Sequence, residues 1–429
     1  MDDSVFSSQF LAMHDAFARN QIDIEVAYTP SGRVDYIYEA GRLLARSDKK
    51  RIGGIAKVLP GVHPVTVPGF PKDSPLTLLS IDDLEEGYLT VPQALDVLDA
   101  RLDIHGPEPD GFPLVTPVHI LHITQSSPDT TRTCPATEPE VPCCCGPDQP
   151  CAPCPPAAPA GGAGVSIGIC DSGLLPNLPS ALSWLNQVTC GPTDWDPLGP
   201  VLPSGLFDIP RYCGHGTFVA GVAASQAPEA SVYVTKDFVM AGGEREWVIV
   251  QQLEALIARR PQLVNLSAGT YSRKDWPLLS FLAFELGDIV LTAAAGNDAT
   301  HRRFYPAAFP WAIAVGALGA DLRNRAWFSN YGDWVDVFTL GEGLVNAYAT
   351  GQYTYLEPPK RPATQVFDGI ARWSGTSFAA PMVAGLIAAR MSSSVDVGQA
   401  TLGLLDEARQ NAIDGVGPVV LPWQPPGAA

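Results

Sequence analysis

The strongest constraint on this chain is an alternation of apolar strand-like runs with helical segments, which starts at Val165 and continues to about residue 415. Strands that alternate with helices form a mostly parallel sheet with helices on both faces. We therefore expect an α/β fold over residues 164–415. The expected strands are VSIGIC (165–170), SVYVTKDF (231–238), LVNLSAG (263–269), DIVLTAAAGN (288–297) and WAIAVGAL (311–318), and the expected helices are TFVAGVAAS (217–225), WVIVQQLEALIARR (247–260), WPLLSFLAFELG (276–287) and SFAAPMVAGLIAARM (377–391).

Residues 1–124 have a different pattern, which predicts a small α+β module in front of the α/β domain. The segment TVPQALDVLDARL (90–102) carries its leucines on one helical face. Thr90 is placed to cap this helix, and Pro92 falls in its first turn. Three further runs alternate like strands, namely IDIEVAYT (22–29), VDYIYEA (34–40) and VTPVHILHIT (115–124).

The stretch 125–163 is rich in Pro, Cys and Gly and has no periodicity, so it is interpreted as a linker. Six of the nine cysteines lie within Cys134–Cys154, and CAPC (151–154) has the spacing of a zinc knuckle. However, no histidine is nearby, and three consecutive cysteines cannot all face one ion. A flexible linker with exposed thiols is favoured over a metal site, and no cofactor is predicted. Residues 416–429 are expected to form an irregular tail.

The charge and hydropathy of the chain exclude several kinds of partner. The formal net charge of −18 repels phosphates, so no nucleic acid is expected; the charge serves solubility or attracts cationic peptides. No apolar run approaches 18 residues, so no membrane association is expected. The N-terminus lacks the features of a signal peptide. This predicts a cytoplasmic protein, with leaderless export left open.

Four polar residues fall at strand ends or helix starts, where α/β sheets place their sites. Asp171 follows a buried strand, His215 lies between two glycines, and Asn297 ends another strand. Ser377 stands at the start of a helix, whose N–H groups and dipole can stabilise an oxyanion. Taken singly, each has an ordinary structural explanation. Asp171 and Asn297 could be turn residues, His215 could be a hydrogen-bonded histidine without a catalytic role, and Ser377 could be a helix cap. Together they supply a nucleophile, a base, an acid that orients the base and a donor for negative charge.

The blocks around these residues carry a family resemblance. DSG (171–173), HGTFVAG (215–221) and GTSFAAP (375–381) resemble, in this order, the three signature blocks of the subtilisin family of serine peptidases. The resemblance covers residues 165 to about 392, and the segment 351–370 looks longer than in compact members. Weaker matches are AAGN (294–297), NLSAG (265–269), YPAAFPWAIAVGA (305–317) and FSNYG (328–332).

The resemblance implies a subtilisin-type serine endopeptidase acting on a peptide or protein substrate. Ser377 would be the nucleophile, His215 the general base and Asp171 its orienting acid, with Asn297 in the oxyanion hole. Phe304 stands where many members have a small residue, so we expect it to shorten the pocket for the residue before the scissile bond. The expected substrate-binding residues are Leu266, Ser267, Ala268, Gly269, Ala295, Gly296 and Phe304.

Residues 1–124 stand where secreted members of the family carry a cleavable pro-region. A permanent module that docks a partner protein is the favoured interpretation, because no export signal is seen. Two rival functions remain: a non-catalytic peptide-binding protein, whose mark would be a missing triad residue, and a metal-binding adaptor organised by the cysteine cluster.

Overall fold

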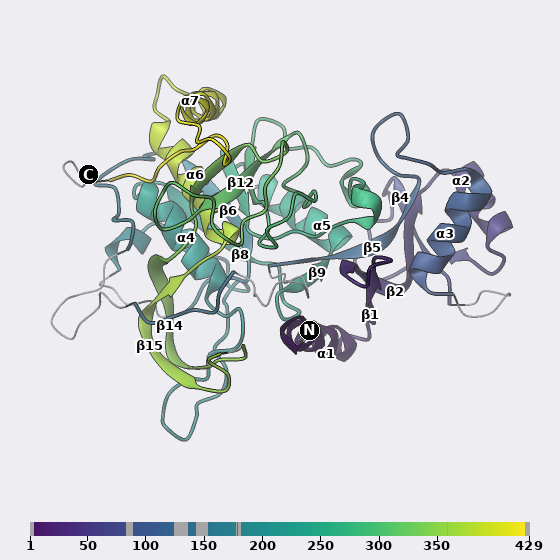
Figure 1. Cartoon of the computed structure of the whole chain (residues 1–429), viewed down its shortest axis with the longest axis horizontal. Helices are drawn as coiled ribbons and strands as arrows, with labels where there is room; N and C mark the ends of the chain where they lie inside the picture. The colour runs from purple at the N-terminus through teal and green to yellow at the C-terminus, as the bar shows by residue number, and fades with distance from the viewer. Residues whose placement is uncertain are drawn as a thin grey trace.

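The computed structural model describes residues 4–82, 89–123, 136–142, 153–176, 178, 182–357 and 359–424. Seven described strands form a parallel sheet in the order β13-β12-β11-β10-β6-β8-β7, which confirms the predicted α/β fold (Figure 1). The strand order reverses beside β6, so the carboxyl ends of its neighbours open on one edge. The strands are β6 (Ser166–Asp171), β7 (Val188–Cys190), β8 (Ser231–Lys236), β10 (Leu263–Leu266), β11 (Val290–Ala294), β12 (Ala312–Leu318) and β13 (Val337–Leu340).

Helices cover both faces of this sheet. The buried side chains of α4 and α6 share one core with Ile167 and Ile169 of β6, and those of α5 share the opposite core with Cys170 and Val264. Successive strand residues point to opposite faces, which explains why one strand contributes to both cores. The helices are α4 (His215–Gln226), α5 (Glu246–Ile257), α6 (Thr376–Arg390) and α7 (Val397–Gln410), with the short turns η1 (Ser183–Leu185), η2 (Arg273–Asp275) and η3 (Leu279–Phe281).

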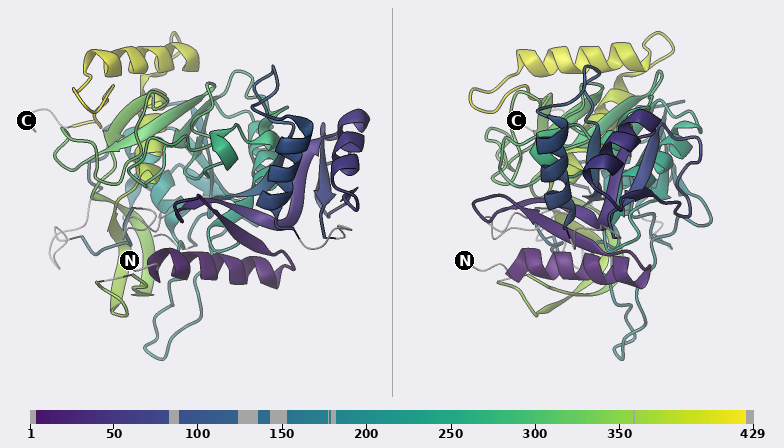
Figure 2. Two further views of the ribbon diagram at one scale, coloured as in Figure 1. Left: turned by 45° about the vertical axis from the view of Figure 1, so that its right-hand side comes forward. Right: turned by 90° about the vertical axis from the view of Figure 1, so that its right-hand side faces the viewer.

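The N-terminal part forms an antiparallel sheet in the order β3-β4-β2-β5-β9, with β1 paired to β2. Its last strand, β9, comes from the peptidase-like part of the chain, so the sheet joins the two parts. Figure 2 places α1 on the opposite side of this sheet from α2 and α3. The elements are α1 (Ser4–Arg19), β1 (Ile24–Tyr28), β2 (Val34–Arg46), α2 (Lys49–Val58), β3 (His63–Pro64), β4 (Leu76–Ser80), α3 (Val91–Leu102), β5 (Val115–His122) and β9 (Gly243–Arg245).

Predictions of single elements were confirmed where the residues that form the element also mark its start or end. Thr90 caps α3 through a reciprocal pair of hydrogen bonds with Gln93, as its position predicted. The helix predicted over 276–287 is wrong, since only the turn η3 forms there. Its Ser280 gives both its backbone N–H and its hydroxyl to the Glu246 carboxylate, which replaces a helical hydrogen bond.

A two-stranded hairpin lies before the last core helix. It consists of β14 (Leu344–Thr354) and β15 (Thr364–Trp373), and it contains the segment that looked long in the sequence. Two described pieces of the predicted linker pair with this hairpin, because Cys154 bridges to Val345 and Glu140 bridges to Arg372. The cysteine cluster, Cys154 apart, lies outside the described residues. The described parts contain no group of His, Cys, Asp and Glu that could hold a metal ion.

Candidate active site

Three elements bring the predicted catalytic residues to one edge of the sheet. Asp171 is the last residue of β6, His215 is the first residue of α4, and Ser377 lies in the first turn of α6. The two helices pack closely because Gly385 has no side chain; a Cβ there would come within 2.5 Å of the Ala223 carbonyl oxygen. Gly216 likewise allows α4 to approach the turn after β6. Small residues therefore position the site.

Asp171 and His215 form a buried pair. The His215 Nδ1 lies 2.6 Å from the Asp171 Oδ1, which also accepts the Ser172 N–H at 2.7 Å. Trp373 and Phe378 pack on the imidazole, with ring centroids 5.7 and 5.4 Å away. The His215 Nε2 is buried and has no hydrogen-bond partner among the described residues. This pairing makes Nδ1 the donor and leaves Nε2 as the nitrogen that can accept a proton.

A proline one turn later in α6 determines which group bonds the Ser377 carbonyl. Pro381 has no N–H to bond the Ser377 carbonyl, as a helix residue would, and the Ser267 hydroxyl donates to that carbonyl instead at 2.6 Å. This bond ties the start of α6 to the segment after β10. The Ser377 hydroxyl points at the Ser267 carbonyl, 3.4 Å away, and makes no hydrogen bond with His215.

Asn297 is held by the same helix start. Its Oδ1 accepts both the backbone N–H and the hydroxyl of Thr376, each at 2.9 Å. These bonds fix the amide so that its Nδ2 end is the donor. Asn330, which sequence reasoning left inside a structural block, supports the loop by accepting the Asp298 N–H and donating to the Ala295 carbonyl.

A second pair was missed in the sequence. The Ser172 hydroxyl accepts the Gly216 N–H and donates to Asp196, each at 3.0 Å. Asp196 also accepts the Gly214 N–H at 2.7 Å, so the two residues hold both glycines that flank His215. Burial raises the pKa of Asp196 to about 7. Asp196 lies in an irregular loop far from any signature block, and no local signal could have identified it.

Four of the predicted substrate-binding residues line a nearly filled pocket, namely Ser267, Ala268, Gly296 and Phe304. Phe304 lies against two glycines, since a Cβ on Gly269 or Gly296 would come within 2.5 or 3.1 Å of its ring. The remaining cavity measures about 10 Å³ and is also lined by Ser377 and by His122 and Ile123 of the N-terminal part. Leu266 ends β10 beside this pocket, and Ala295 follows β11.

The end of β5 lies across this site. The backbones of His122 and Gly269 exchange two hydrogen bonds, at 3.0 and 3.2 Å, and the Ile123 N–H bonds the Gly242 carbonyl at 2.9 Å. On its other side, β5 pairs with β9. The strand therefore lies between two backbone segments, and Ser377 is only 2% exposed.

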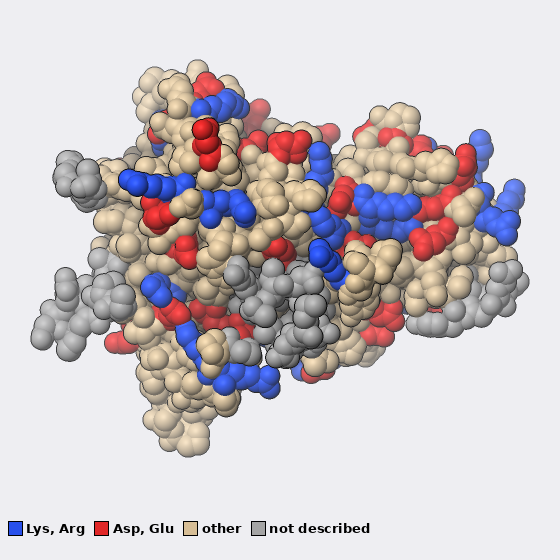
Figure 3. All heavy atoms as spheres, in the orientation of Figure 1, with Lys and Arg blue, Asp and Glu red and all other residues tan. Residues whose placement is uncertain are grey.

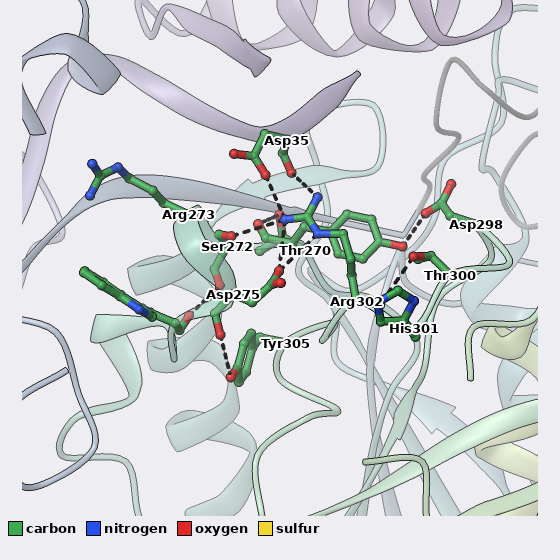
Figure 4. Close-up of polar contacts among 12 residues, drawn as sticks. Asp35, Thr270, Ser272, Arg273, Asp275, Asp298, Thr300, His301, Arg302 and Tyr305 are labelled. Carbon is green, nitrogen blue, oxygen red and sulfur yellow. Dashed lines mark hydrogen bonds and ion pairs between the residues drawn. The ribbon is translucent and has the colours of Figure 1, made fainter. Parts of the chain in front are cut away.

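Polar contacts hold the N-terminal part in this position. Arg302 bonds Asp35 of β2 and also Asp275, and Figure 4 shows its guanidinium between the two carboxylates. Arg273 bonds two carboxylates of α3. His119 of β5 is buried; its Nδ1 lies 3.0 Å from Glu246, and its Nε2 accepts the Arg273 N–H. Apolar contacts add to these polar ones, since Val118 of β5 packs in one cluster with Trp247 and Leu279, and Ile120 packs with Met240.

The distribution of surface charge does not favour one class of binding partner over another. Acidic and basic side chains are interspersed on the face in Figure 3, and neither sign forms a continuous field there. No helix in the described part of the chain combines the length and the apolar character needed to cross a bilayer.

Known proteins match the region that contains the site. Subtilisin-like protease PopC of Myxococcus xanthus is 34% identical over 259 residues, which are 53% of this chain and 51% of that protein. Subtilisin DY of Bacillus licheniformis is 29% identical over 54% of this chain and 78% of its own length. The chain spans about half or less of the first three curated relatives it matches.

The fold has a match that extends beyond this region. The crystal structure of fervidolysin from Fervidobacterium pennivorans, described as a keratinolytic enzyme related to subtilisin, aligns with 90% of this chain and 60% of its own. The TM-score is 0.53 at 18% identity, which is a likeness of fold alone. The Subtilase family matches residues 162–402, which is more than half of the chain. The chain therefore belongs to the subtilase family.

Proposed function

We propose that this protein is a serine endopeptidase in which Ser377 attacks, His215 moves the proton and Asp171 orients the imidazole. The observation that carries the proposal is the 2.6 Å contact between Asp171 and His215, which leaves Nε2 without a partner among the described residues. The imidazole packs against Phe378, the residue after Ser377 in the first turn of α6. All members of a Ser-His-Asp arrangement are present, which disfavours a non-catalytic peptide-binding protein.

The chemistry proceeds in two halves. When the Ser377 hydroxyl turns from the Ser267 carbonyl toward His215, Nε2 takes its proton while Oγ bonds the substrate carbonyl carbon. The Asn297 amide and the Ser377 N–H hold the resulting oxyanion. The imidazolium then gives its proton to the leaving amine as the C–N bond breaks. Water repeats the sequence on the acyl-enzyme and releases the acid.

A fluorophosphonate probe tests this proposal directly, because it reacts only with an activated serine. The expected adduct lies on Ser377 and is located by mass spectrometry of the digested chain. An adduct on another serine, or none after β5 has been displaced, would rule out the proposed nucleophile.

The position of the Phe304 ring against Gly269 and Gly296 supports a preference for small side chains before the scissile bond. Phe304→Gly should raise kcat/KM for a peptide with Phe at that position by at least about tenfold relative to its Ala analogue, because it opens room for the ring. Phe304→Leu keeps most of the volume and serves as the control. The kcat/KM values for the two peptides measure this preference. Thermal melts measure how much stability the cavity left by Phe304→Gly costs. Equal preference in Phe304→Gly and the native chain would contradict this role.

The strand β5 supports a second proposal, that the N-terminal part inhibits the site by occupying the place of a peptide substrate. Its backbone pairs with Gly269 as an extended peptide would in β-augmentation, and its end lines the same small pocket as Ser377. A pro-region fits these contacts better than a module reserved for a partner protein, because the module's own strand already fills the cleft. Whether residues 1–124 separate from the rest by cleavage stays a prediction.

Acid should weaken this inhibition through His122. Burial lowers the pKa of His122 to about 3 from its ordinary value of 6.5, and neither ring nitrogen has a hydrogen-bond partner among the described residues. Release of the strand is thus coupled to proton uptake, so the docked form is stable above about pH 6.5 and loses stability as the pH falls toward 3. From pH 7.5 to 4.5, docking should weaken about a hundredfold.

Hydrogen exchange in the Ser377→Ala chain measures this effect. The protection factor of the β5 amides, corrected for intrinsic exchange at each pH, should fall about a hundredfold over that range. His122→Leu, which cannot titrate, is the matched control and should show a much flatter profile. The same pH dependence in both chains would show that groups other than His122 cause the effect.

A further inference from the structure

The segment 136–142 lies as a short added strand on the free edge of the hairpin. Glu140 and Arg372 exchange two backbone hydrogen bonds, from the Glu140 N–H at 2.9 Å and from the Arg372 N–H at 2.7 Å. On its other side, Arg372 is paired with Val345 of β14. Extended peptides dock on sheet edges in this way, with backbone bonds for affinity and side-chain pockets for specificity.

Two glutamates, separated by Pro139, reach into this edge. The Glu140 carboxylate bonds both Lys360 and Arg372. Partial burial works against ionisation of Glu140, but these hydrogen bonds and charges prevail and lower its pKa. Glu138 accepts the Tyr353 hydroxyl and the Leu356 N–H, each at 2.9 Å. The edge thus binds two acidic side chains, Glu138 and Glu140, which are separated by one residue.

A buried cation faces the first glutamate. The Arg211 side chain is 8% exposed and lines a cavity of about 10 Å³ that Glu138 also lines. One guanidinium nitrogen bonds Glu357 at 2.6 Å, and the other terminal nitrogen has no hydrogen-bond partner among the described residues. Burial and the neighbouring Glu357 raise the pKa of Glu138 to about 7. The arginine charge acts in the opposite direction and favours an anionic occupant.

The same segment touches the residue that packs on the catalytic imidazole. The Trp373 indole donates to the Thr137 carbonyl at 2.6 Å. Its ring meets His215 edge-on at 5.7 Å. Phe218, Tyr348 and Phe378 also pack on the Trp373 ring. The bond to Thr137 therefore connects the docked segment to one wall of the active site through a single side chain.

We propose that the hairpin site, formed by Arg211, Tyr353, Lys360, Arg372 and Trp373, is a second peptide-binding site for extended segments with the pattern Glu-x-Glu. Its resident occupant is the chain's own segment 136–142. Occupation holds Trp373 against His215 and raises turnover. The effect on turnover rests on the proposed peptidase function, whereas the binding does not.

Binding is tested in a chain whose resident segment has been weakened. In the Ser377→Ala background, which prevents hydrolysis, Glu138→Ala together with Glu140→Ala should free the site. A fluorescein-labelled peptide PATEPEVP, the sequence of residues 135–142, should then bind saturably by fluorescence polarisation, at least about tenfold more tightly than PATQPQVP. The chain with its native segment should bind much less, because its own strand competes. Equal binding of the two peptides, or none up to about 1 mM, would overturn the site.

Turnover is tested with the same two substitutions in the active chain. The expected result is a loss of about tenfold in kcat with little change in KM, since the substrate cleft is untouched. Added PATEPEVP should restore kcat, and PATQPQVP should not; a chain that is merely damaged would not recover. The control Glu254→Ala, at an exposed helix position, should have no effect. Saturable binding without recovery of kcat would overturn the coupling through Trp373. Failure of the native chain to react with fluorophosphonate after β5 has been displaced would overturn the peptidase function but not the binding.

Discussion

Replacing Ser377 with alanine is expected to lower kcat by on the order of a millionfold, the loss known for the same change in a subtilisin. The hydroxyl oxygen supplies the bond of the acyl-enzyme, and no other described side chain is placed to replace it at the start of α6. Substrate positioning and the Asn297 amide would still act, leaving a rate roughly a thousandfold above that of water. The comparison uses kcat on one fluorogenic peptide at equal protein concentration.

Non-additivity makes this test specific for a triad. His215→Ala alone should cost about as much as Ser377→Ala, and the double variant should lose little more, because neither residue works without the other. Ser394→Ala, at an exposed serine far from the sheet edge, should keep full activity. Losses that multiply in the double variant would mean that Ser377 and His215 act in separate steps.

Asn297→Ala is expected to lower kcat by about 100- to 1000-fold with KM nearly unchanged. In the proposed mechanism the amide donates to charge that develops only in the transition state, so its removal would leave ground-state binding intact. Steady-state kinetics on the same fluorogenic peptide separate the two constants.

The alanine variant also removes the acceptor for Thr376, so a second variant is needed. Asn297→Asp keeps an oxygen for the Thr376 N–H and hydroxyl but cannot donate from the other end when ionised. It should be at least as slow as Asn297→Ala. If activity returned in Asn297→Asp, Asn297 would serve to hold α6 rather than to bind the oxyanion.

The position of β5 explains how such a site could be kept closed. The strand uses the backbone of Gly269, which a substrate would also need, and it is fixed by ion pairs such as Arg302 with Asp35. The strand is also held by apolar contacts, such as Val118 with Trp247. In the proposed acid effect, protonation of His122 would weaken the docking of this same strand.

The parts of the fold that follow from local pattern were predictable from sequence. The seven-stranded sheet comes largely from apolar runs with strand length, and the capping box of α3 can be read from Thr90 and Gln93 alone. The positions of Asp171, His215, Ser377 and Asn297 follow from short blocks whose chemistry is contained in a few neighbouring residues. Such patterns can be recognised in a sequence because hydrophobic periodicity, helix capping and turn chemistry each depend on fewer than about ten neighbouring residues.

Contacts between distant segments left no such trace. Nothing in the residues around His122 indicates that its backbone would pair with Gly269, because main-chain hydrogen bonds do not depend on side-chain identity. The predicted helix at 276–287 failed since Glu246, a residue on another helix, takes the Ser280 N–H. Two further contacts likewise arise only when the chain is folded. Asp196 accepts the N–H of Gly214, beside His215, and Glu138 binds Tyr353 of the hairpin. Each contact joins residues that no local pattern relates.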